Sequence, residues 1–191
     1  MAEYKLQDTD YPSTYEYHKD RERAPHLEQP WQAIRMHKAA DFVKLVNPSG
    51  VVDLGCGDGG MLTLLRPIPS HGYDWHDASV AGWAERGVTA EQRDVFVSRP
   101  DDLVWAELVV ATEVLEHLAD PHGTVRWIAS HDEVKWLVAS SPVNERPGPG
   151  QDSHIWAWDF EGYEKLVVDG GFEVVEHEVV EWSQVLLARK V

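Results

Sequence analysis

The stretch Val51–Gly60, with the sequence VVDLGCGDGG, is the feature that most constrains how this chain can fold. Its branched apolar residues favour a buried strand. The closely spaced glycines that follow allow a tight turn and let a ligand approach the backbone without obstruction from Cβ atoms. The next segment, Met61–Leu65, is apolar and compatible with a helix. A strand, a glycine loop and a helix N-terminus in this order predict a crevice that binds a nucleotide-like ligand.

The glycines alone do not identify that ligand. Gly55, Gly57 and Gly60 also fit the fingerprint of dehydrogenases that bind a dinucleotide, and a glycine cluster after an apolar run is often only a turn. Asp53, two residues before the first glycine, adds a carboxylate to the pattern. Residues further along the chain therefore have to decide between these interpretations.

Length and composition indicate one intracellular globular domain. With 191 residues, 43% of them hydrophobic and 26% charged, the chain is long enough for one well-buried domain and short for two. It has no apolar run long enough to span a membrane, and its first residues lack an apolar signal core. The single cysteine, Cys56, cannot form an internal disulfide, and we interpret it as a space-filling residue rather than a nucleophile. We therefore expect a cytoplasmic protein.

The formal charge of −16 disfavours nucleic acid as a partner. Proteins that bind nucleic acid ordinarily gather lysines and arginines to neutralise phosphates. Here 17 basic residues face 33 acidic ones, and the densest basic run, Lys19–Arg23, is interleaved with acids. A small-molecule ligand fits this charge better than a polyanion does. The sequence gives no indication of the oligomeric state.

Alternating strands and helices predict an α/β fold with a single Rossmann-like, doubly wound sheet, mostly parallel with an antiparallel last strand. We expect an N-terminal arm or cap at residues 1–30 and one ligand-binding domain at residues 31–191. The loop Asn144–Gly150 follows a strand, at the end where open α/β sheets bind ligands. The expected helices are 31–46, 61–65, 78–86, 121–130 and 160–169, and after the strand that opens at Val51 the expected strands are 70–73, 89–93, 108–112, 135–140, 172–177 and 182–190. In the first helix, apolar residues recur at helical spacing: Ile34, Ala39, Phe42, Val43 and Val46.

Three more motifs follow the next strands in order. Asp74 ends the second strand, where a carboxylate can accept both hydroxyls of a ribose, and Asp94 ends the third. Thr112–Leu118, with the sequence TEVLEHL, follows the central strand. Together with Val51–Gly60, these motifs resemble the class I S-adenosylmethionine (SAM)-dependent methyltransferases. Within that superfamily they are most similar to small-molecule O-methyltransferases of the ubiquinone-biosynthesis type, which carry a Glu-x-x-Glu-His motif.

This resemblance implies SAM as the cofactor and methyl transfer to a hydroxyl of a small-molecule acceptor. It places Asp74 on the ribose, and Asp94 with the backbone N–H of Val95 on the adenine. The implied cofactor-binding residues are Asp53, Gly55, Cys56, Gly57, Asp74, Asp94, Val95 and Thr112.

The Glu-x-x-Glu-His motif also suggests a metal site. Glu113, Glu116 and His117 lie at i, i+3 and i+4, so on one helical turn they would face the same way. Two carboxylates and an imidazole can hold Mg²⁺ or another divalent metal. The resemblance extends to small-RNA 3′-end methyltransferases, which add a downstream histidine, and His154 lies where one would be needed. Those enzymes often carry a second histidine where this chain has Leu118.

Other interpretations remain open at this point. Without a metal, Glu116 and His117 cap a helix and line the pocket, His117 is the best candidate general base, and His154 is the second. An RNA ribose 2′-O-methyltransferase is an alternative enzyme of the same superfamily. An NAD-linked oxidoreductase and a non-catalytic SAM-binding module are alternatives from other functional classes.

Overall fold

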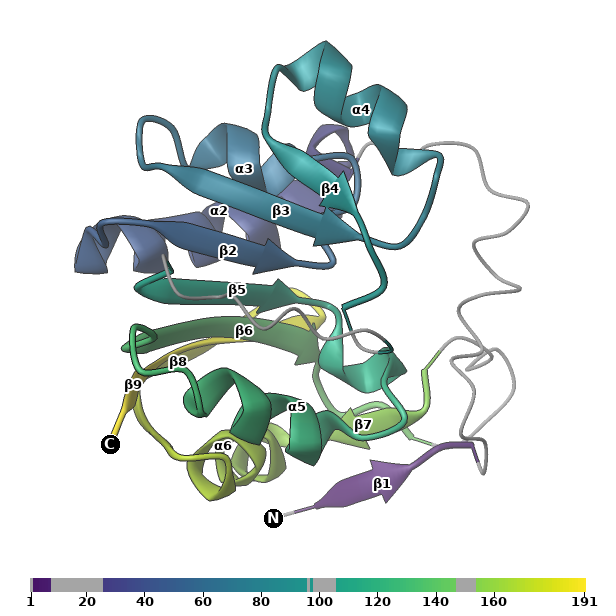
Figure 1. Ribbon diagram of the computed structural model, residues 1–191. Coiled ribbons are helices and arrows are strands. Elements are labelled where there is room, and N and C mark those ends of the chain that lie inside the picture. Colours follow the sequence, from purple (N-terminus) through teal and green to yellow (C-terminus); the bar gives the residue numbers. More distant parts are fainter. Residues whose placement is uncertain (1, 8–25, 96, 98–105, 147–153) are drawn as a thin grey trace.

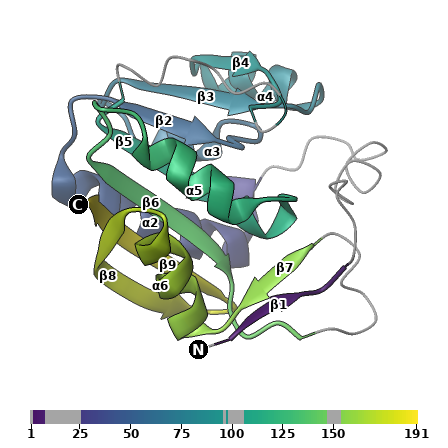
Figure 2. The same ribbon diagram turned by 60° about the horizontal axis from the view of Figure 1, so that its bottom comes forward.

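The computed structural model describes residues 2–7, 26–95, 97, 106–146 and 154–191. Most of the expected arm at residues 1–30 therefore lies outside the described residues. Within them, one large twisted sheet carries helices on both faces, and a small two-stranded sheet lies beside it (Figures 1 and 2).

The strands are β1 (Glu3–Lys5), β2 (Val51–Leu54), β3 (Ser70–Asp74), β4 (Ala90–Gln92), β5 (Leu108–Thr112), β6 (Trp136–Pro142), β7 (Trp156–Trp158), β8 (Phe172–Val180) and β9 (Ser183–Lys190). The α-helices are α2 (Pro30–Val46), α3 (Gly60–Leu64), α4 (Ser79–Arg86), α5 (Pro121–Ala129) and α6 (Phe160–Asp169). Two 3₁₀ helices are η1 (His26–Glu28) and η2 (Leu115–His117). No helix in the described part of the chain is both long and apolar enough to cross a membrane.

The large sheet has seven strands in the order β4-β3-β2-β5-β6-β9-β8. Neighbouring strands from β4 to β6 are parallel, and β9 runs antiparallel to both β6 and β8. The predicted doubly wound sheet with an antiparallel last strand is thus confirmed. The chain order reverses between β2 and β5, and in open α/β sheets ligands bind outside the carboxyl ends of the strands at such a point.

The central strands are buried on both faces, as their mainly apolar sequences favour. All four residues of β2 are buried, as are the first four of β5. On one face α5 and α6 pack against these strands, and α2 covers the other face (Figure 1). Two apolar clusters thus hold the sheet between helical layers, and each fully buried Leu or Val side chain contributes roughly 1.5–3 kcal/mol.

Helix α2 ends where the sequence predicts. Asn47 takes a left-handed conformation (φ 52°) and its N–H bonds to the carbonyl of Val43, which closes the last turn. One side-chain direction differs from expectation: Ile34 is 45% exposed, whereas its neighbour Arg35 is only 6% exposed. Arg35 faces inward, where its Nη1 lies 3.2 Å from Oε2 of Glu113, a partly buried residue just after β5.

The small sheet was not predicted. Strand β1 pairs antiparallel with β7, with Tyr4 opposite Ala157. Beyond the pair, the N–H of Leu6 bonds to the carbonyl of Ile155 (2.7 Å), and the N–H of Ile155 bonds to the carbonyl of Glu116 (2.7 Å). The start of the chain is therefore joined through β7 to the segment that follows β5.

Candidate active site

The glycine loop after β2 is tightly held by its neighbours. The N–H groups of Gly55 and Cys56 both donate to the carbonyl of Tyr73 at the end of β3 (2.8 and 3.0 Å). Gly55 has φ +73°, and a Cβ there would lie 2.6 Å from Cγ2 of Val114. Only glycine fits this position, because both the backbone conformation and the space exclude a side chain.

Asp74 links this loop to the end of β3. Its carboxylate accepts the N–H of Gly57 (2.8 Å), the N–H of His76 (2.9 Å) and the hydroxyl of Ser79 (3.2 Å). Burial raises the pKa of Asp74, and the three hydrogen bonds act against that rise. A carboxylate offers about four acceptor positions, so capacity remains for a ligand hydroxyl.

The carboxylate of Asp53 is buried without a partner in the described part of the chain. It is 1% exposed, and neither carboxylate oxygen has a hydrogen-bond partner among the described residues. Burial, and then the neighbouring Asp74, raise the pKa of Asp53 well above its usual range. An unpartnered buried carboxylate is costly unless a cation completes it, so this residue fits a ligand that brings positive charge to the loop.

Side chains from α4 support the loop from the other side. The indole N–H of Trp83 donates to the carbonyl of Gly57 (2.7 Å). Arg86 binds the carboxylate of buried Asp58 through two nitrogens, at 2.7 and 3.2 Å. Helix α3 has only five residues, so its dipole is small. The loop conformation therefore depends on α4 as well as on its own glycines.

The remaining predicted cofactor residues lie at the same edge of the sheet. Asp94 and Val95 follow β4, and the Asp94 side chain accepts the N–H of Val97 (3.2 Å) while Val95 is 2% exposed. Thr112 is the last residue of β5. All eight predicted cofactor residues thus belong to β2, β3, β5 or the loops that follow β2 and β4.

Cys56 has the environment of a space-filling residue. It is buried, and its Sγ would lie 2.5 Å from a Cβ placed at Gly72. Burial, followed by the charges of Asp53 and Asp74, raises the pKa of its thiol well above the usual range. A thiol that resists ionisation is a poor nucleophile.

The predicted helical turn that would align Glu113 with Glu116 and His117 is wrong. Glu113 has φ +54° and precedes η2, a 3₁₀ helix that begins only at Leu115. The Glu113 carboxylate lies 3.2 Å from Nη1 of Arg35 and accepts the hydroxyl of Ser140 (2.9 Å). It is therefore committed to α2 and β6, although its charge still acts on Glu116.

Glu116, His117 and His154 come together. One oxygen of Glu116 and one ring nitrogen of each histidine all lie within 4.8 Å of one another. Glu116 is fully buried, and neither of its carboxylate oxygens has a hydrogen-bond partner among the described residues. Burial, and then the charge of Glu113, raise the pKa of Glu116 well above its usual range. Two imidazoles beside an unpartnered buried carboxylate form a donor set that can hold a divalent metal.

The position of His154 depends on residues that the motifs did not single out. Its Nδ1 lies 2.7 Å from Oε2 of Glu145, and the indole N–H of Trp156 donates to the carbonyl of Leu118 (2.9 Å). Glu145 belongs to the loop after β6, which the sequence marks as a ligand-binding position. Nothing in the sequence pattern identifies Arg35 or Ser140, because their roles arise from contacts between distant elements.

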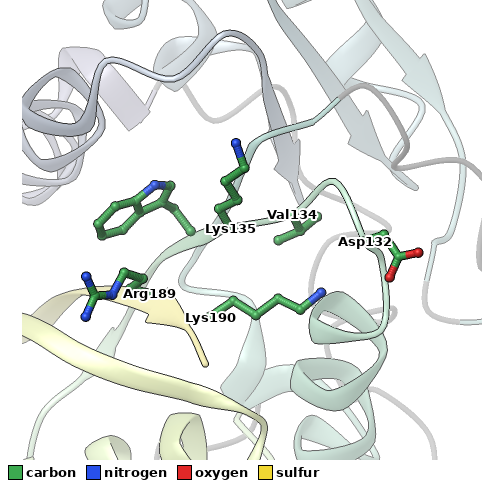
Figure 3. Close-up of a pocket in the computed structure, with 6 residues that line it drawn as sticks. Asp132, Val134, Lys135, Arg189 and Lys190 are labelled. Carbon is green, nitrogen blue, oxygen red and sulfur yellow. The ribbon is translucent and has the colours of Figure 1, made fainter.

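A cavity of about 280 Å³ lies at the opposite edge of the sheet, where β6 begins and β9 ends (Figure 3). Three cationic side chains line it, and each has a partner: Lys135 with Glu107, Arg189 with Glu173, and Lys190 with the carbonyl of His131. This cavity is remote from the carboxyl ends of the parallel strands and forms no part of the candidate site.

Comparisons with known proteins agree with the fold, and the matched family pattern spans the glycine loop. The sequence pattern of a family described as a methyltransferase domain matches residues 26–177. The trans-aconitate 2-methyltransferase of Mycobacterium sp. (strain KMS) is 32% identical over an alignment of 109 positions, which covers 51% of this chain and 39% of that protein. The chain thus spans about two fifths of the length of this curated relative.

Two solved structures show the same fold over nearly the whole chain. The N-methyltransferase NodS from Bradyrhizobium japonicum WM9, in complex with S-adenosylhomocysteine (SAH), has a TM-score of 0.70 at 14% identity and covers 95% of this chain and 99% of its own. Magnesium protoporphyrin IX methyltransferase from Synechocystis PCC 6803, with bound SAH, has a TM-score of 0.68 at 14% identity and covers 93% of each chain. The architecture is that of class I methyltransferases, and because the family pattern matches well over half of its length, this chain belongs to the methyltransferase domain family.

Proposed function

We propose that this chain is a SAM-dependent methyltransferase that transfers a methyl group to a hydroxyl of a small-molecule acceptor. The observation that carries the cofactor assignment is Asp53, a buried carboxylate without a partner beside a glycine loop. SAM carries both an ammonium and a sulfonium charge, so it is a ligand that suits such a group. Family membership and the folds of two SAH-bound proteins support the same assignment.

The proposed cofactor contacts follow the edge of the sheet. Asp74 keeps free acceptor capacity for a ribose hydroxyl while it holds the N–H of Gly57. Asp94 and the backbone of Val95 face the adenine, and the backbone of Gly55 and Cys56 allows close approach. SAM supplies a methyl group already activated by its sulfonium, so much of the catalysis comes from holding the acceptor oxygen in position.

The histidines and Glu116 supply the chemistry at the acceptor. The Nε2 atom of His117 lies 3.9 Å from Oε1 of Glu116, and the rings of His117 and His154 are 4.7 Å apart between centroids. Both histidine side chains are 19% exposed, so they are accessible to a small acceptor. A ring nitrogen of His117 takes the proton of the acceptor hydroxyl as the oxygen bonds to the methyl carbon and the carbon–sulfur bond breaks.

A divalent metal fits the same three residues. Bound there, it would lower the pKa of the acceptor hydroxyl. Imidazole ligands suit transition metals, whereas Mg²⁺ prefers oxygen. With Glu113 committed to Arg35, the remaining donor set of Glu116, His117 and His154 has two nitrogens and one carboxylate, so we expect Mn²⁺, Co²⁺ or Zn²⁺ to bind more tightly than Mg²⁺.

An acceptor with a carboxylate is the second candidate. The matched relative is, by name, a methyltransferase of trans-aconitate. In this chain Arg35 is buried next to Glu113, and its Nε has no hydrogen-bond partner among the described residues. An anionic group on the acceptor could use that donor. RNA is disfavoured by the charge of −16.

The test begins with calorimetric titration of SAH, with NAD as the control, in the presence of EDTA. Micromolar binding of SAH without binding of NAD supports the cofactor assignment, and preference for NAD would refute it. Turnover is then followed as SAH formation with a catechol, a sugar, a tricarboxylate and a short RNA, each with EDTA or with Mn²⁺. Methylation of the catechol or sugar supports the proposal, whereas methylation of the tricarboxylate or the RNA alone contradicts it.

The cluster of Glu116, His117 and His154, here called the histidine cluster, has its own test. His117→Ala should lower kcat by 10²–10⁴-fold, the usual contribution of a general base, and leave SAH affinity unchanged. His131→Ala is the matched control, because His131 lies at the other end of α5 with its Nδ1 on the carbonyl of Trp127. Equal turnover by the two variants would exclude His117 from the reaction.

A further inference from the structure

A second carboxylate, that of Glu145, contacts the cluster of Glu116, His117 and His154. Its Oε2 lies 2.7 Å from Nδ1 of His154, and the two side chains are 18% and 19% exposed. Glu113, which the motif would have placed there, is engaged by Arg35 and Ser140 instead.

This contact fixes which nitrogen of His154 carries the proton. An ionised carboxylate can only accept hydrogen bonds, so the Nδ1 of His154 must donate to it. The neutral ring then has its lone pair on Nε2. A metal ligand or a proton acceptor needs that lone pair, and an outer carboxylate on the other nitrogen commonly holds the ring in place and increases its basicity.

We propose that Glu145 is the positioning residue of His154: it holds the ring in the Nδ1–H tautomer and leaves Nε2 for the metal or the acceptor proton. The inference rests on the proposed function in one respect, because it takes Glu116, His117 and His154 as the working cluster. Glu145 itself belongs to the loop after β6, and we assign it no contact with the acceptor.

The backbone around His154 is held independently of Glu145. The side-chain amide of Gln7 donates to the backbone carbonyl of His154 (3.0 Å). The N–H of Ile155 donates to the carbonyl of Glu116 (2.7 Å). Strand β7 then continues into the pairing with β1. Loss of the Glu145 carboxylate should therefore free the ring of His154 without moving its main chain.

The protein also contains a matched control pair. Nδ1 of His177 lies 3.1 Å from Oε1 of Glu164, which is the same kind of contact between α6 and β8. Glu164→Ala removes a histidine partner of the same type outside the cluster. The variants to compare are thus Glu145→Ala and Glu164→Ala. Glu145→Gln keeps an acceptor at the same place without the charge.

The first measurement is a long-range ¹H–¹⁵N NMR spectrum of the metal-free protein, with the His154 ring assigned from His154→Gln. We expect His154 to be in the Nδ1–H tautomer in the unsubstituted protein and in Glu164→Ala. In Glu145→Ala we expect a mixture of tautomers, and in Glu145→Gln a fraction of the Nδ1–H tautomer between these two. An unchanged His154 tautomer in Glu145→Ala would overturn the proposal. This measurement does not depend on methyl transfer.

The second measurement is calorimetric titration with Co²⁺, together with the visible absorption of the bound ion. Loss of an outer-shell partner typically weakens metal affinity 10–100-fold, so we expect that loss in Glu145→Ala and none in Glu164→Ala. If the unsubstituted protein binds no Co²⁺, the metal part of the proposed function fails while the tautomer result stands separately. If affinity falls with the tautomer unchanged, Glu145 is itself a ligand and its positioning role is refuted.

Discussion

The burial of Asp53 fits the proposed cofactor. Folding removes its carboxylate from water and offers it no hydrogen bond from the described residues, so the ionised form destabilises the protein. Glycines and apolar residues around it could be predicted from the sequence pattern alone. The sequence pattern does not predict that the Asp53 carboxylate lacks a hydrogen-bond partner among the described residues, because that depends on how the neighbouring elements pack around it.

This burial gives stability a particular dependence on pH. The pKa of Asp53 is raised in the folded protein, so the cofactor-free protein should lose stability as pH rises from about 3.9, the pKa of an unfolded aspartate, through the raised folded value. Asp53→Asn cannot ionise and should be more stable at pH 8 by on the order of 1 kcal/mol, with no gain below about pH 4. Urea unfolding at both pH values measures this, with exposed Asp41→Asn as the control. A gain that is the same at both pH values would contradict the explanation.

Asp74 should be needed for cofactor affinity in two ways. Asp74→Ala removes the expected partner of the ribose and also the acceptor for the N–H of Gly57. A hydrogen bond to a charged group is worth about 1.5–3 kcal/mol, so we expect SAH to bind roughly tenfold more weakly, or worse. Calorimetric titration measures this, with the exposed Asp77→Ala as control. Equal affinities would exclude Asp74 from the cofactor site.

At the scale of elements, the sequence predicts the large sheet well because each strand has a local signal. Strand β5 is a nearly continuous apolar run and β2 is apolar except for Asp53. Helix α6 has the predicted bounds, Phe160–Asp169. Strands β1 and β7 have three residues each, which is too short for any periodicity to show. Their existence depends on a pairing between segments far apart in the sequence.

The candidate site could also be predicted only where the sequence carries a local signal. The residues predicted to bind the cofactor lie at or near the carboxyl ends of strands, because each belongs to a predicted strand or closely follows one. The metal set differs at Glu113, since one left-handed residue and a 3₁₀ helix replace the expected helical turn. The contact of Glu145 with His154 could not be predicted, because no local sequence pattern places a carboxylate of the loop after β6 against this histidine.

Strand β1 should stabilise the segment that carries His154. The Oε2 atom of Glu3 accepts the indole N–H of Trp158 (2.7 Å) and contacts Nε2 of His122 (2.8 Å), which connects β1 to β7 and α5. In Glu3→Ala, we expect the amide of Ile155 to exchange with solvent roughly tenfold faster, since about 1.4 kcal/mol of local stability is lost. Hydrogen exchange measures this, and exposed Glu133→Ala should leave that amide unchanged. Equal exchange in the two variants would show that β1 holds the segment without Glu3.

At the scale of the whole molecule, cofactor binding should raise the free energy of unfolding. A ligand that binds only the folded state at 100 times its Kd contributes about 2.7 kcal/mol. In a chain of this size that corresponds to a rise in Tm of roughly 5–10 °C. Thermal unfolding with SAH should show this rise, and NAD at the same concentration should not. A comparable rise with NAD would place the chain with dinucleotide-binding proteins instead.

The contact between Trp83 and the glycine loop has a practical consequence. An indole whose N–H bonds to the carbonyl of Gly57 changes its fluorescence when that carbonyl or its surroundings move. The chain has nine tryptophans, so the signal of this one is the difference between the spectra of the unsubstituted protein and Trp83→Phe. Trp83 is thus an intrinsic fluorescent reporter for the glycine loop, and candidate ligands can be screened by fluorescence without any label.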